Sequence, residues 1–586
     1  MKRAASVTLV IGLAIGLAAG CADAPELGSA RFPLTEANFF RLRIFEAPAD
    51  MLSGQDPVFD TGCIQRQSRT YELSNIPVGS GYAVVYEGFA IASCAETSRV
   101  EIGFRGLVDI EKGKEPYYHV PVYPAGRVAP LPENLNLSAS VAEPIDFCDG
   151  ADDCGGELDV CYDVARPEYW CVPSCRADAD CVDLHPLATC DLATEWCMLR
   201  SPYPFNLSEP RAWGAAVTLP DGDVLFVGGL RDSPGGFGPT RHWLERFDAE
   251  LGLLAPAEVT GAESVPAGRF GFASLSSQRH VTVGGVRALS GVAWNPAGEG
   301  LVVEAEWSTA LMDSIVVFEP DASGAGGRAT SSSLSRAVSE PAVLPLGADR
   351  FWVAGGLVVS GPTLAATKAT SVCTVAEDLS VTCEAGVELK QPRFAPAVAC
   401  LDAACARVLV VGGNVSGRVG EIVDLGAQTV EALETLGLAD KAFYPRLCGN
   451  LLVGGSALAS SPQPFPPVRL SIDGRLLEGS ALQGAATTSV LLGALVGGQT
   501  TFADPAGCLI GGGFGGDGAL AAIHQAGASG VVKVADATFG QARFAAVGAV
   551  IGAGVLDGRV VFGGGLAFPA GIGPAQVVRG LEVFTP

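Results

Sequence analysis

Apolar and polar residues alternate in short runs along most of the chain, and glycine or proline separates the runs. Near the N-terminus Phe40, Leu42 and Ile44 are apolar, and the residues between them are arginines. Successive side chains of a strand point to opposite faces, so this period of two predicts a strand with one buried face. A second unit, at 71–84, places a Pro-Gly turn between two alternating runs. We therefore predict an all-β domain over residues 33–126.

A Gly-Gly pair preceded by a short apolar run recurs seven times in the C-terminal two-thirds of the chain. Successive pairs lie about 40 to 70 residues apart, which is the spacing of β-propeller blades. We expect glycine here because a side chain would collide with the neighbouring blade. The pairs are Gly228 and Gly229, Gly284 and Gly285, Gly355 and Gly356, Gly412 and Gly413, Gly454 and Gly455, Gly511 and Gly512, and Gly563 and Gly564.

Other features accompany the pairs. Arginines stand at the start of five copies, namely Arg211, Arg269, Arg336, Arg393 and Arg543. After several pairs a third strand carries a glutamate two residues before an aromatic ring, as in Glu245 and Phe247. Together these features resemble the kelch family, whose fold a copper oxidase shares. The resemblance implies a seven-bladed kelch-type β-propeller over residues 199–586. The N-terminal alternating segments resemble the small β-sandwich accessory domains of bacterial surface lipoproteins.

Two parts of the repeat region depart from the regular pattern, namely the last repeat and a long insert in the second repeat. The last repeat reaches Pro586 directly after its third strand. We expect residues 203–207 to supply the outer strand, because closure of this kind joins the first and last blades and hides their edges. The second repeat carries a long insert at 291–312 with Trp294 and Trp307. This insert is either a binding loop or a simple elaboration of the fold.

Residues 147–198, which follow a Pro- and Ala-rich linker at 127–146, hold eight cysteines in two copies of one pattern. The copies are Cys148, Cys154, Cys161 and Cys171, and then Cys175, Cys181, Cys190 and Cys197. A module of about 25 residues cannot bury enough apolar surface to fold alone, so we predict that disulfides replace a core. Pairing inside each copy leaves three connectivities open. Zinc needs Cys-x2-4-Cys spacing, which only Cys171 and Cys175 approach, so no metal is predicted.

The other cysteines downstream of residue 21 suggest four further disulfides. One pair lies in the first β domain, one flanks a hairpin, one brackets a tight turn, and one joins neighbouring repeats just before their Gly-Gly pairs. The candidates are Cys63 with Cys94, Cys373 with Cys383, Cys400 with Cys405, and Cys448 with Cys508.

The first residues predict a secretion signal. Lys2 and Arg3 are basic, and the apolar stretch at 7–17 is too short to span a bilayer as a mature helix. The sequence Leu-Ala-Ala-Gly-Cys at 17–21 resembles the lipobox of bacterial lipoproteins, with Ala18 at a position where Leu is usual. A lipobox cysteine accepts diacylglycerol on its thiol.

The lipobox resemblance implies that residues 1–20 are a signal peptide and that 21–32 are a lipidated tether anchored through Cys21. Ala22, in place of Asp, implies the outer membrane, on its periplasmic or cell-surface side. Without Cys21 the chain keeps an even number of cysteines, as expected in an oxidising compartment.

The net charge and the residues that could carry chemistry exclude several classes of function. The chain has 38 Lys and Arg against 63 Asp and Glu, a formal net charge of −25, which argues against nucleic acid as a partner. The histidines of the repeat region, His242, His280 and His524, lie in different repeats without paired spacing, so no copper site or other cofactor is predicted. No Gly-x-Ser-x-Gly elbow or phosphate-binding loop occurs in the sequence. We therefore assign no catalytic residues.

Two functions remain. The first is a membrane-anchored envelope lipoprotein that binds an envelope protein or polysaccharide through its propeller loops, without catalysis. The alternative is a secreted propeller enzyme acting on glycans, which predicts several acids and aromatic residues converging at one mouth of the channel.

Overall fold

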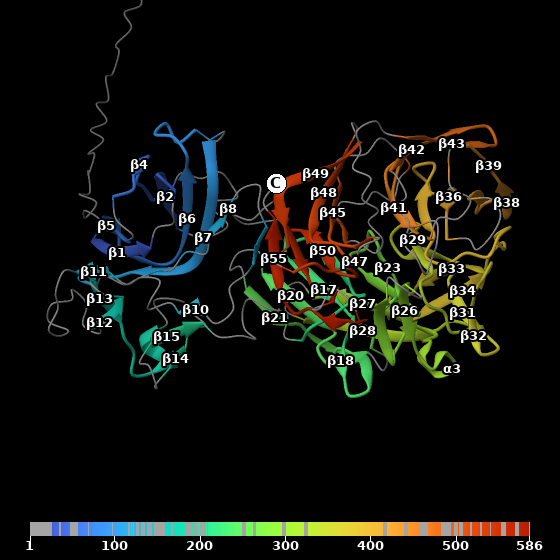
Figure 1. Ribbon diagram of the computed structural model, residues 1–586, viewed down its shortest axis with the longest axis horizontal. Coiled ribbons are helices and arrows are strands. Elements are labelled where there is room, and N and C mark those ends of the chain that lie inside the picture. Colours follow the sequence, from blue (N-terminus) through green and yellow to red (C-terminus); the bar gives the residue numbers. More distant parts are fainter. Residues whose placement is uncertain are drawn as a thin grey trace, which may run out of the picture.

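The computed structural model describes residues 26–584 apart from internal gaps, of which the longest cover 47–56, 146–158, 457–466 and 482–493. Its regular structure is almost wholly β-strand, and the α-helix among the described residues is the single turn α3 (Trp307–Ala310). The expected all-β class is confirmed. Figure 1 shows two bodies, one holding the N-terminal strands and the other holding the strands from β16 (Ala215–Thr218) onward.

The first domain contains two antiparallel sheets that share one apolar core. Phe40, Leu42 and Ile44 are fully buried, and they pack in one cluster with Phe32 and Tyr86, as the alternation predicts. One sheet pairs β1 (Leu27–Pro33) with β5 (Thr70–Pro77). The other has the order β3 (Phe59–Asp60), β2 (Phe39–Phe45), β6 (Gly79–Phe89), β7 (Arg99–Ile110) and β8 (Val122–Pro124), with β4 (Ile64–Gln65) also beside β2.

The cysteine-rich region forms two three-stranded sheets, one for each copy of the pattern. In both copies a hairpin sets the third cysteine opposite the fourth, Cys161 opposite Cys171 and Cys190 opposite Cys197. The sheets are β11 (Glu143–Ile145), β13 (Glu168–Pro173) and β12 (Asp159–Ala165), and then β10 (Leu135–Asn136), β15 (Trp196–Leu199) and β14 (Thr189–Asp191).

Disulfides hold the second cysteine module. Cys175 bonds Cys190 and Cys181 bonds Cys197, so the connectivity is first to third and second to fourth. The bonds of the first module lie outside the described residues. The other predicted disulfides, Cys63–Cys94, Cys373–Cys383, Cys400–Cys405 and Cys448–Cys508, are all formed.

In its described part, the rest of the chain contains seven sheets that each include a run of four antiparallel strands, together with smaller two- and three-stranded sheets; in six of the seven the four strands follow the order of the chain. The first three sheets are β16, β17 (Val224–Val227), β20 (Leu244–Asp248) and β21 (Leu253–Pro256); β23 (Gly271–Ser274), β24 (His280–Val283), β27 (Ser314–Pro320) and β28 (Gly326–Ser333); and β29 (Ala342–Pro345), β30 (Arg350–Ala354), β33 (Thr370–Val375) and β34 (Val381–Ala385).

The remaining four sheets continue this pattern. They are β35 (Ala397–Cys400), β36 (Arg407–Val411), β37 (Gly420–Asp424) and β38 (Thr429–Ala432); β40 (Phe443–Cys448), β41 (Leu451–Ser456), β42 (Val468–Asp473) and β43 (Leu476–Ala481); β44 (Ala494–Val496), β45 (Cys508–Gly511), β48 (Ala522–Gly527) and β49 (Gly530–Thr538); and β50 (Val547–Val550), β51 (Val560–Gly563), β55 (Leu581–Phe584) and β9 (Val128–Pro130). Short strands β22 (Glu258–Thr260) and β39 (Glu434–Leu436) add parallel to β28 and β43.

The outer strand of the seventh sheet differs from the expectation. Strand β9 takes the outer position beside β55, with Ala129 opposite Val583, and of residues 203–207 the structure describes only Leu207. Leu207 contacts the same sheet through its backbone N–H, which donates to the carbonyl of Arg579 at 3.3 Å. Residues 127–146, predicted to be a linker, thus contribute short strands to three different sheets.

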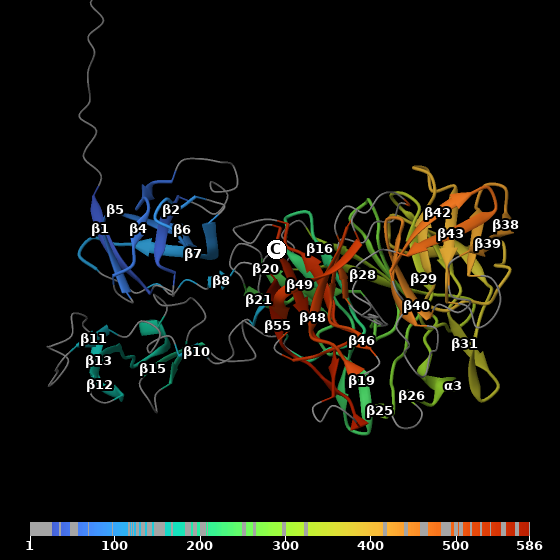
Figure 2. The same ribbon diagram turned by 45° about the horizontal axis from the view of Figure 1, so that its top comes forward.

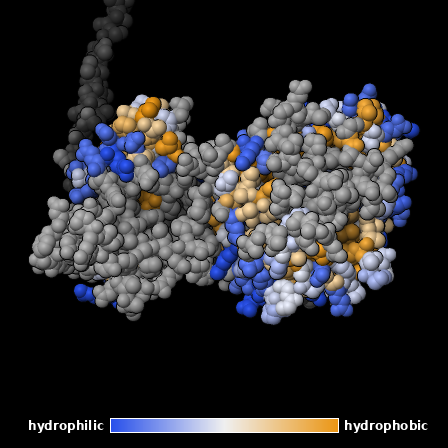
Figure 3. Space-filling model, in the orientation of Figure 1, coloured by the Kyte–Doolittle hydropathy of each residue, from blue (hydrophilic) through white to orange (hydrophobic). Residues whose placement is uncertain are grey.

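Neighbouring sheets contact each other through their opening strands, and the seventh sheet contacts the first. Strands β16 and β50 lie side by side, as do β23 and β29. Thr218 of β16 donates its hydroxyl to the carbonyl of Val550 in β50 at 2.5 Å. Figure 3 shows hydrophilic residues along the lower and right-hand rims of this body.

Several glycines of the Gly-Gly pairs pack closely against the next sheet. A Cβ on Gly284 would lie 2.1 Å from the carbonyl oxygen of Val338, and one on Gly355 would lie 2.5 Å from that of Arg393. In the last two sheets the pairs with positive φ begin one residue later than predicted, at Gly512 and Gly564, and Gly454 and Gly455 lie within β41.

Hairpins after several of these glycines project from one side of the sheets (Figure 2). The insert at 291–312 forms β25 (Gly291–Asn295), β26 (Gly300–Glu304) and α3, and β25 pairs with β53 (Gly573–Pro574) from the seventh repeat. Trp294 is buried in a cluster with Phe237 and Phe568. The insert is therefore docked on the first and seventh repeats.

Candidate binding site between the opening strands

A set of equivalent residues lies just before or at the start of the opening strands, and all have left-handed backbone conformations. Their φ angles lie between 43° and 55° although none is glycine; they are Trp213, Arg269, Glu340, Ala395, Tyr444 and Ala545. Such a conformation costs roughly 1 kcal/mol or more for a residue with a side chain, so the surrounding structure must impose it.

Hydrogen bonds between sheets impose this conformation. The N–H of Trp213 donates to the carbonyl of Ala545 at 3.0 Å, and that of Arg269 donates to Trp213 at 3.1 Å. The N–H of Glu340 donates to Arg269 at 2.8 Å, and Ala395 continues the series by donating to Glu340 at 2.8 Å. Four of the six left-handed residues, namely Trp213, Arg269, Glu340 and Ala395, are thereby tied to a counterpart in the preceding sheet.

Several of these side chains line a cavity of about 360 Å³ between the opening strands. Its wall includes Trp213, Arg269, Glu340 and Tyr444 from four different sheets, together with Arg446 of β40. Phe270, Phe272, Leu447 and Leu495 add apolar surface. The volume and the mixture of aromatic and charged groups are typical of a small-molecule site.

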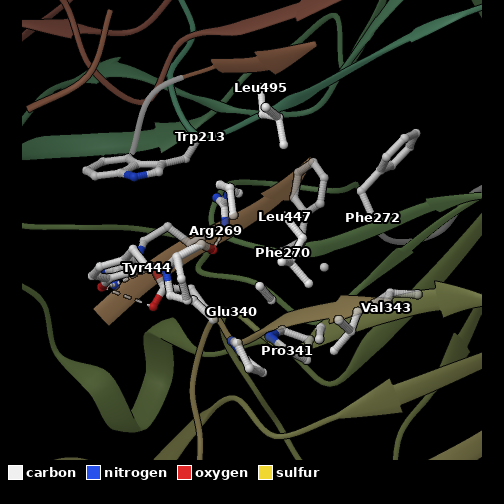
Figure 4. A pocket seen from close by; sticks show the side chains of 18 of the residues that line it. Trp213, Arg269, Phe270, Phe272, Glu340, Pro341, Val343, Tyr444, Leu447 and Leu495 are labelled. Carbon is white, nitrogen blue, oxygen red and sulfur yellow. Dashed lines mark hydrogen bonds and ion pairs between the residues drawn. The ribbon is translucent and has the colours of Figure 1, made fainter. Parts of the chain in front are cut away.

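Arg269, Glu340 and Tyr444 form one polar cluster (Figure 4). Arg269 Nε donates to Glu340 Oε1 at 2.8 Å, and Arg269 Nη2 lies 3.2 Å from the Tyr444 hydroxyl. That hydroxyl donates to Glu340 Oε2 at 3.2 Å. The Arg269 guanidinium also lies 5.7 Å from the ring centre of Trp213, within the range of a cation–π contact.

The charges of this cluster are set by burial and by each other. Burial lowers the pKa of Arg269, but Glu340 and Tyr444 outweigh that effect and raise the pKa above its ordinary value. Burial, reinforced by the charge of Glu340, raises the pKa of Tyr444 far above its usual range. Arg269 is therefore charged and Tyr444 is a neutral hydroxyl at physiological pH, so the cluster presents fixed donors.

Two further groups on the cavity wall lack such partners among the described residues. The indole Nε1 of Trp213 is buried and makes no hydrogen bond. The Arg446 guanidinium makes one long hydrogen bond, from Nη1 to the carbonyl of Pro445 at 3.5 Å, and forms no ion pair with a described carboxylate. Burial lowers the pKa of Arg446, while the charge of Glu340 opposes that shift.

Three of the predicted repeat-opening arginines have a structural role instead. Each is buried and forms an ion pair with a glutamate of the third strand in its own sheet; the pairs are Arg211–Glu245, Arg393–Glu421 and Arg543–Glu582. Arg269 and Arg336 are not equivalent to them. Ala267 and Val338 occupy the corresponding positions, where their carbonyls accept the N–H of the preceding Gly-Gly pair.

The histidines and the clustered cysteines do not form a metal site among the described residues. His280 is buried and His242 is exposed, and burial lowers the pKa of His280 to about 4. The sulfur atoms of Cys175, Cys181 and Cys190 lie within 4.8 Å of one another, but disulfide bonds engage all three. His119, His185 and the lipidation candidate Cys21 lie outside the described residues.

The sequence alone did not reveal the cavity residues. Trp213, Glu340 and Tyr444 share one position in the repeat, but they have no residue type in common. The signal that could have found them is their spacing from the residue whose backbone carbonyl accepts a hydrogen bond from the preceding Gly-Gly pair. Arg446 carries no repeat signal at all.

Comparison with protein-family models finds no matching family, and comparison with curated proteins finds no relative. In the part of the chain that the structure describes, no helix is both long and apolar enough to cross a bilayer.

Proposed function

We propose that the chain is a lipid-anchored envelope lipoprotein of the bacterial outer membrane, held through Cys21, that binds an envelope component without catalysis. In this proposal residues 199–586 are a seven-bladed kelch-type β-propeller. The N-terminal domain is a β-sandwich, and the cysteine modules space the two apart. The cavity between the opening strands is the binding site.

The arrangement of the sheets supports the propeller. The N–H of Gly285 donates to the carbonyl of Val338 in the next sheet at 2.8 Å, and equivalent bonds from Gly356 and Gly513 reach the next sheets at 2.7 Å. Gly565 makes the same bond to Arg211 of the first sheet at 2.7 Å. A repeated contact that returns to its start is what radial blades require.

The composition of the cavity wall favours binding over glycan hydrolysis. Glycosidases of the common types need two carboxyl groups flanking the scissile bond, one acting as acid and the other as base or nucleophile. Glu340 is the carboxylate among the described wall residues, and both of its oxygens are engaged by Arg269 and Tyr444. The observation that carries the proposal is this cavity with fixed donors and aromatic walls.

Binding to isolated envelopes tests the proposal. Purified full-length protein in mild detergent is mixed with immobilised envelopes, before and after protease digestion of the envelopes. We expect saturable binding by the native protein and by an Arg241→Gln control, whose side chain is 75% exposed outside the cavity. Loss of binding after digestion identifies a protein partner, and retention identifies a polysaccharide. Absence of saturable binding to either preparation, or release of reducing sugar, contradicts the proposal.

The membrane anchor is tested separately. A Cys21→Ser variant should lose incorporation of labelled fatty acid and leave the membrane fraction. A variant that still takes up the label would show that the lipid, if present, is attached elsewhere.

A further inference from the structure

We propose that the cavity between the opening strands binds a carboxylate, with the Arg446 guanidinium as its anchor and the Trp213 indole as an aromatic wall. The ligand class is a small carboxylic acid of sugar-acid size, either free or as the acidic sugar of an envelope polysaccharide. This inference rests on the binding role proposed above and names what the site recognises.

The first observation is that Arg446 differs from the other cavity arginine. Arg269 has Glu340 as an ion-pair partner at 2.7 Å. Arg446 lines the same cavity and has only the carbonyl of Pro445, at 3.5 Å, as a hydrogen-bond acceptor among the described residues. A half-buried guanidinium without a carboxylate is unfavourable, because desolvation is not repaid by an ion pair. Its planar fork of donors matches a carboxylate with two parallel hydrogen bonds.

The second observation is the Trp213 indole. Trp213 is 9% exposed and lines the cavity, and because its Nε1 is closed to solvent the indole contributes an aromatic surface and not a donor. The left-handed backbone of Trp213 is held by the hydrogen bonds to Ala545 and Arg269, which keeps the indole in place before a ligand arrives.

The charges of the cavity wall favour a singly charged anion as the ligand. Arg269 and Arg446 contribute two positive charges to the wall, and Glu340 contributes one negative charge. A single carboxylate would balance the remaining positive charge. A phosphate dianion would instead bring excess negative charge close to Glu340, and that repulsion disfavours it. The cavity is thus a local cationic site on a protein whose formal net charge is −25.

The cavity walls fit a compact ring. Trp213, Tyr444, Phe270 and Phe272 provide flat apolar surfaces from three sheets around the charged groups. The neutral hydroxyl of Tyr444 and the Arg269–Glu340 pair supply fixed polar groups beside them. Rigid donors with aromatic walls favour a ring that carries both hydroxyl groups and an acid over an extended aliphatic acid.

The test measures binding of acetate, glucuronate, uncharged glucose and a polyuronate to the full-length protein by calorimetry and by Trp fluorescence. Arg446→Gln removes the charge, Arg446→Lys keeps the charge without the fork, and Arg241→Gln is the exposed control. We expect glucuronate to bind and glucose not to bind. Arg446→Gln should weaken glucuronate roughly ten-fold or more, and Arg446→Lys should weaken it less. The control should match the native protein.

Chemical labelling gives an independent measurement. An arginine-specific dicarbonyl should modify Arg446 faster than the ion-paired Arg269, and glucuronate should protect Arg446. The inference is overturned if Arg446 is labelled equally fast with acetate, with glucuronate and with neither. It is also overturned if a folded Arg446→Gln variant binds glucuronate with the native affinity. Tighter binding of the polyuronate than of glucuronate identifies a polysaccharide ligand, and the reverse identifies a free acid.

The outcomes also separate this inference from the proposed envelope role. If Arg446→Gln still binds envelopes and the native protein binds no carboxylate, the carboxylate site is wrong and the envelope role stands. If the native protein binds glucuronate but does not bind envelopes, the carboxylate site stands and the envelope role is wrong.

Discussion

The backbone N–H of Gly565 donates to the carbonyl of Arg211 at 2.7 Å, and this bond joins the last sheet of the chain to the first. The neighbouring Gly564 has a φ of 65°, and a Cβ there would lie 2.1 Å from the same carbonyl oxygen. Arg211 in turn reaches Glu245 inside the first sheet. Arg211 therefore accepts a hydrogen bond between two sheets through its carbonyl and forms an ion pair within one sheet through its side chain.

Gly564→Ala should destabilise the protein by about 3 kcal/mol or more, because it adds a steric clash to an unfavourable φ. Gly558→Ala is the matched control: its φ is 77°, but nothing lies within 4 Å of the added Cβ. That change should cost only about 1 kcal/mol. Urea denaturation of the two variants measures the difference. Equal losses would show that the close approach of the two sheets contributes nothing beyond backbone strain.

Arg393→Met should be strongly destabilising. The Arg393 and Glu421 side chains are both fully buried, 2.7 Å apart, and Glu421 also accepts the backbone N–H of Lys390 at 2.7 Å. Removing the arginine leaves a buried carboxylate without its cation, which typically costs about 3–5 kcal/mol.

The exposed pair of Lys114 and Glu111 provides a comparison, since their side chains are 63% and 58% exposed. Lys114→Met should change the free energy of unfolding by less than about 1 kcal/mol. A similar small effect for Arg393→Met would mean that water reaches Glu421 and that the buried pair does not organise the fourth sheet.

The sequence predicted those features that depend on a short-range pattern or on a requirement repeated along the chain. The burial of Phe40, Leu42 and Ile44 follows from strand alternation. Several glycine positions follow from close approach to a neighbour, and the four disulfides outside the cysteine-rich region follow from cysteines that share a domain, a hairpin, a tight turn or equivalent positions in neighbouring repeats. Each of these depends on residues close in sequence or on a repeated requirement.

Pairings between distant segments could not be predicted in this way. Strand β9 bonds β55 through three residues of backbone, and backbone hydrogen bonds carry no side-chain signal. Arg269 resembles the repeat-opening arginines in type but stands two residues after their equivalent position, so the residue type misled the alignment. The cavity residues come from separate repeats, and only the fold brings Arg269 and Tyr444 together.

Removing the Cys448–Cys508 disulfide should cost more stability than removing Cys400–Cys405. The first closes a loop with a sequence separation of 60 and the second one of 5. The chain-entropy relation gives about 4 kcal/mol for the longer loop and about 2 kcal/mol for the shorter one. Double Cys→Ala variants of each pair, unfolded in guanidinium, give the order. The reverse order would show that lost packing of the buried sulfur atoms outweighs loop closure.

Stability should fall as the pH drops from about 6.5 to 4, because of His280. Burial lowers the pKa of its imidazole from 6.5 to about 4 in the folded protein. The unfolded chain therefore binds a proton in this window that the folded chain does not, so stability is complete above 6.5 and is lost on acidification. The loss from His280 alone is about 2 kcal/mol between pH 7.5 and 5.

His280→Phe tests this dependence, because the imidazole lies stacked between Phe272 and Phe318, where a phenyl ring can replace it. The variant loses the contact of Nδ1 with the Ser274 hydroxyl at 3.1 Å, so it should be somewhat less stable at pH 7.5. Its urea midpoint should nevertheless change less between pH 7.5 and 5 than that of the native protein. His242→Gln, at an exposed position, should keep the native dependence. If His280→Phe keeps it as well, the acid sensitivity belongs to other groups, and the buried His524, whose pKa burial also lowers, is the next to replace.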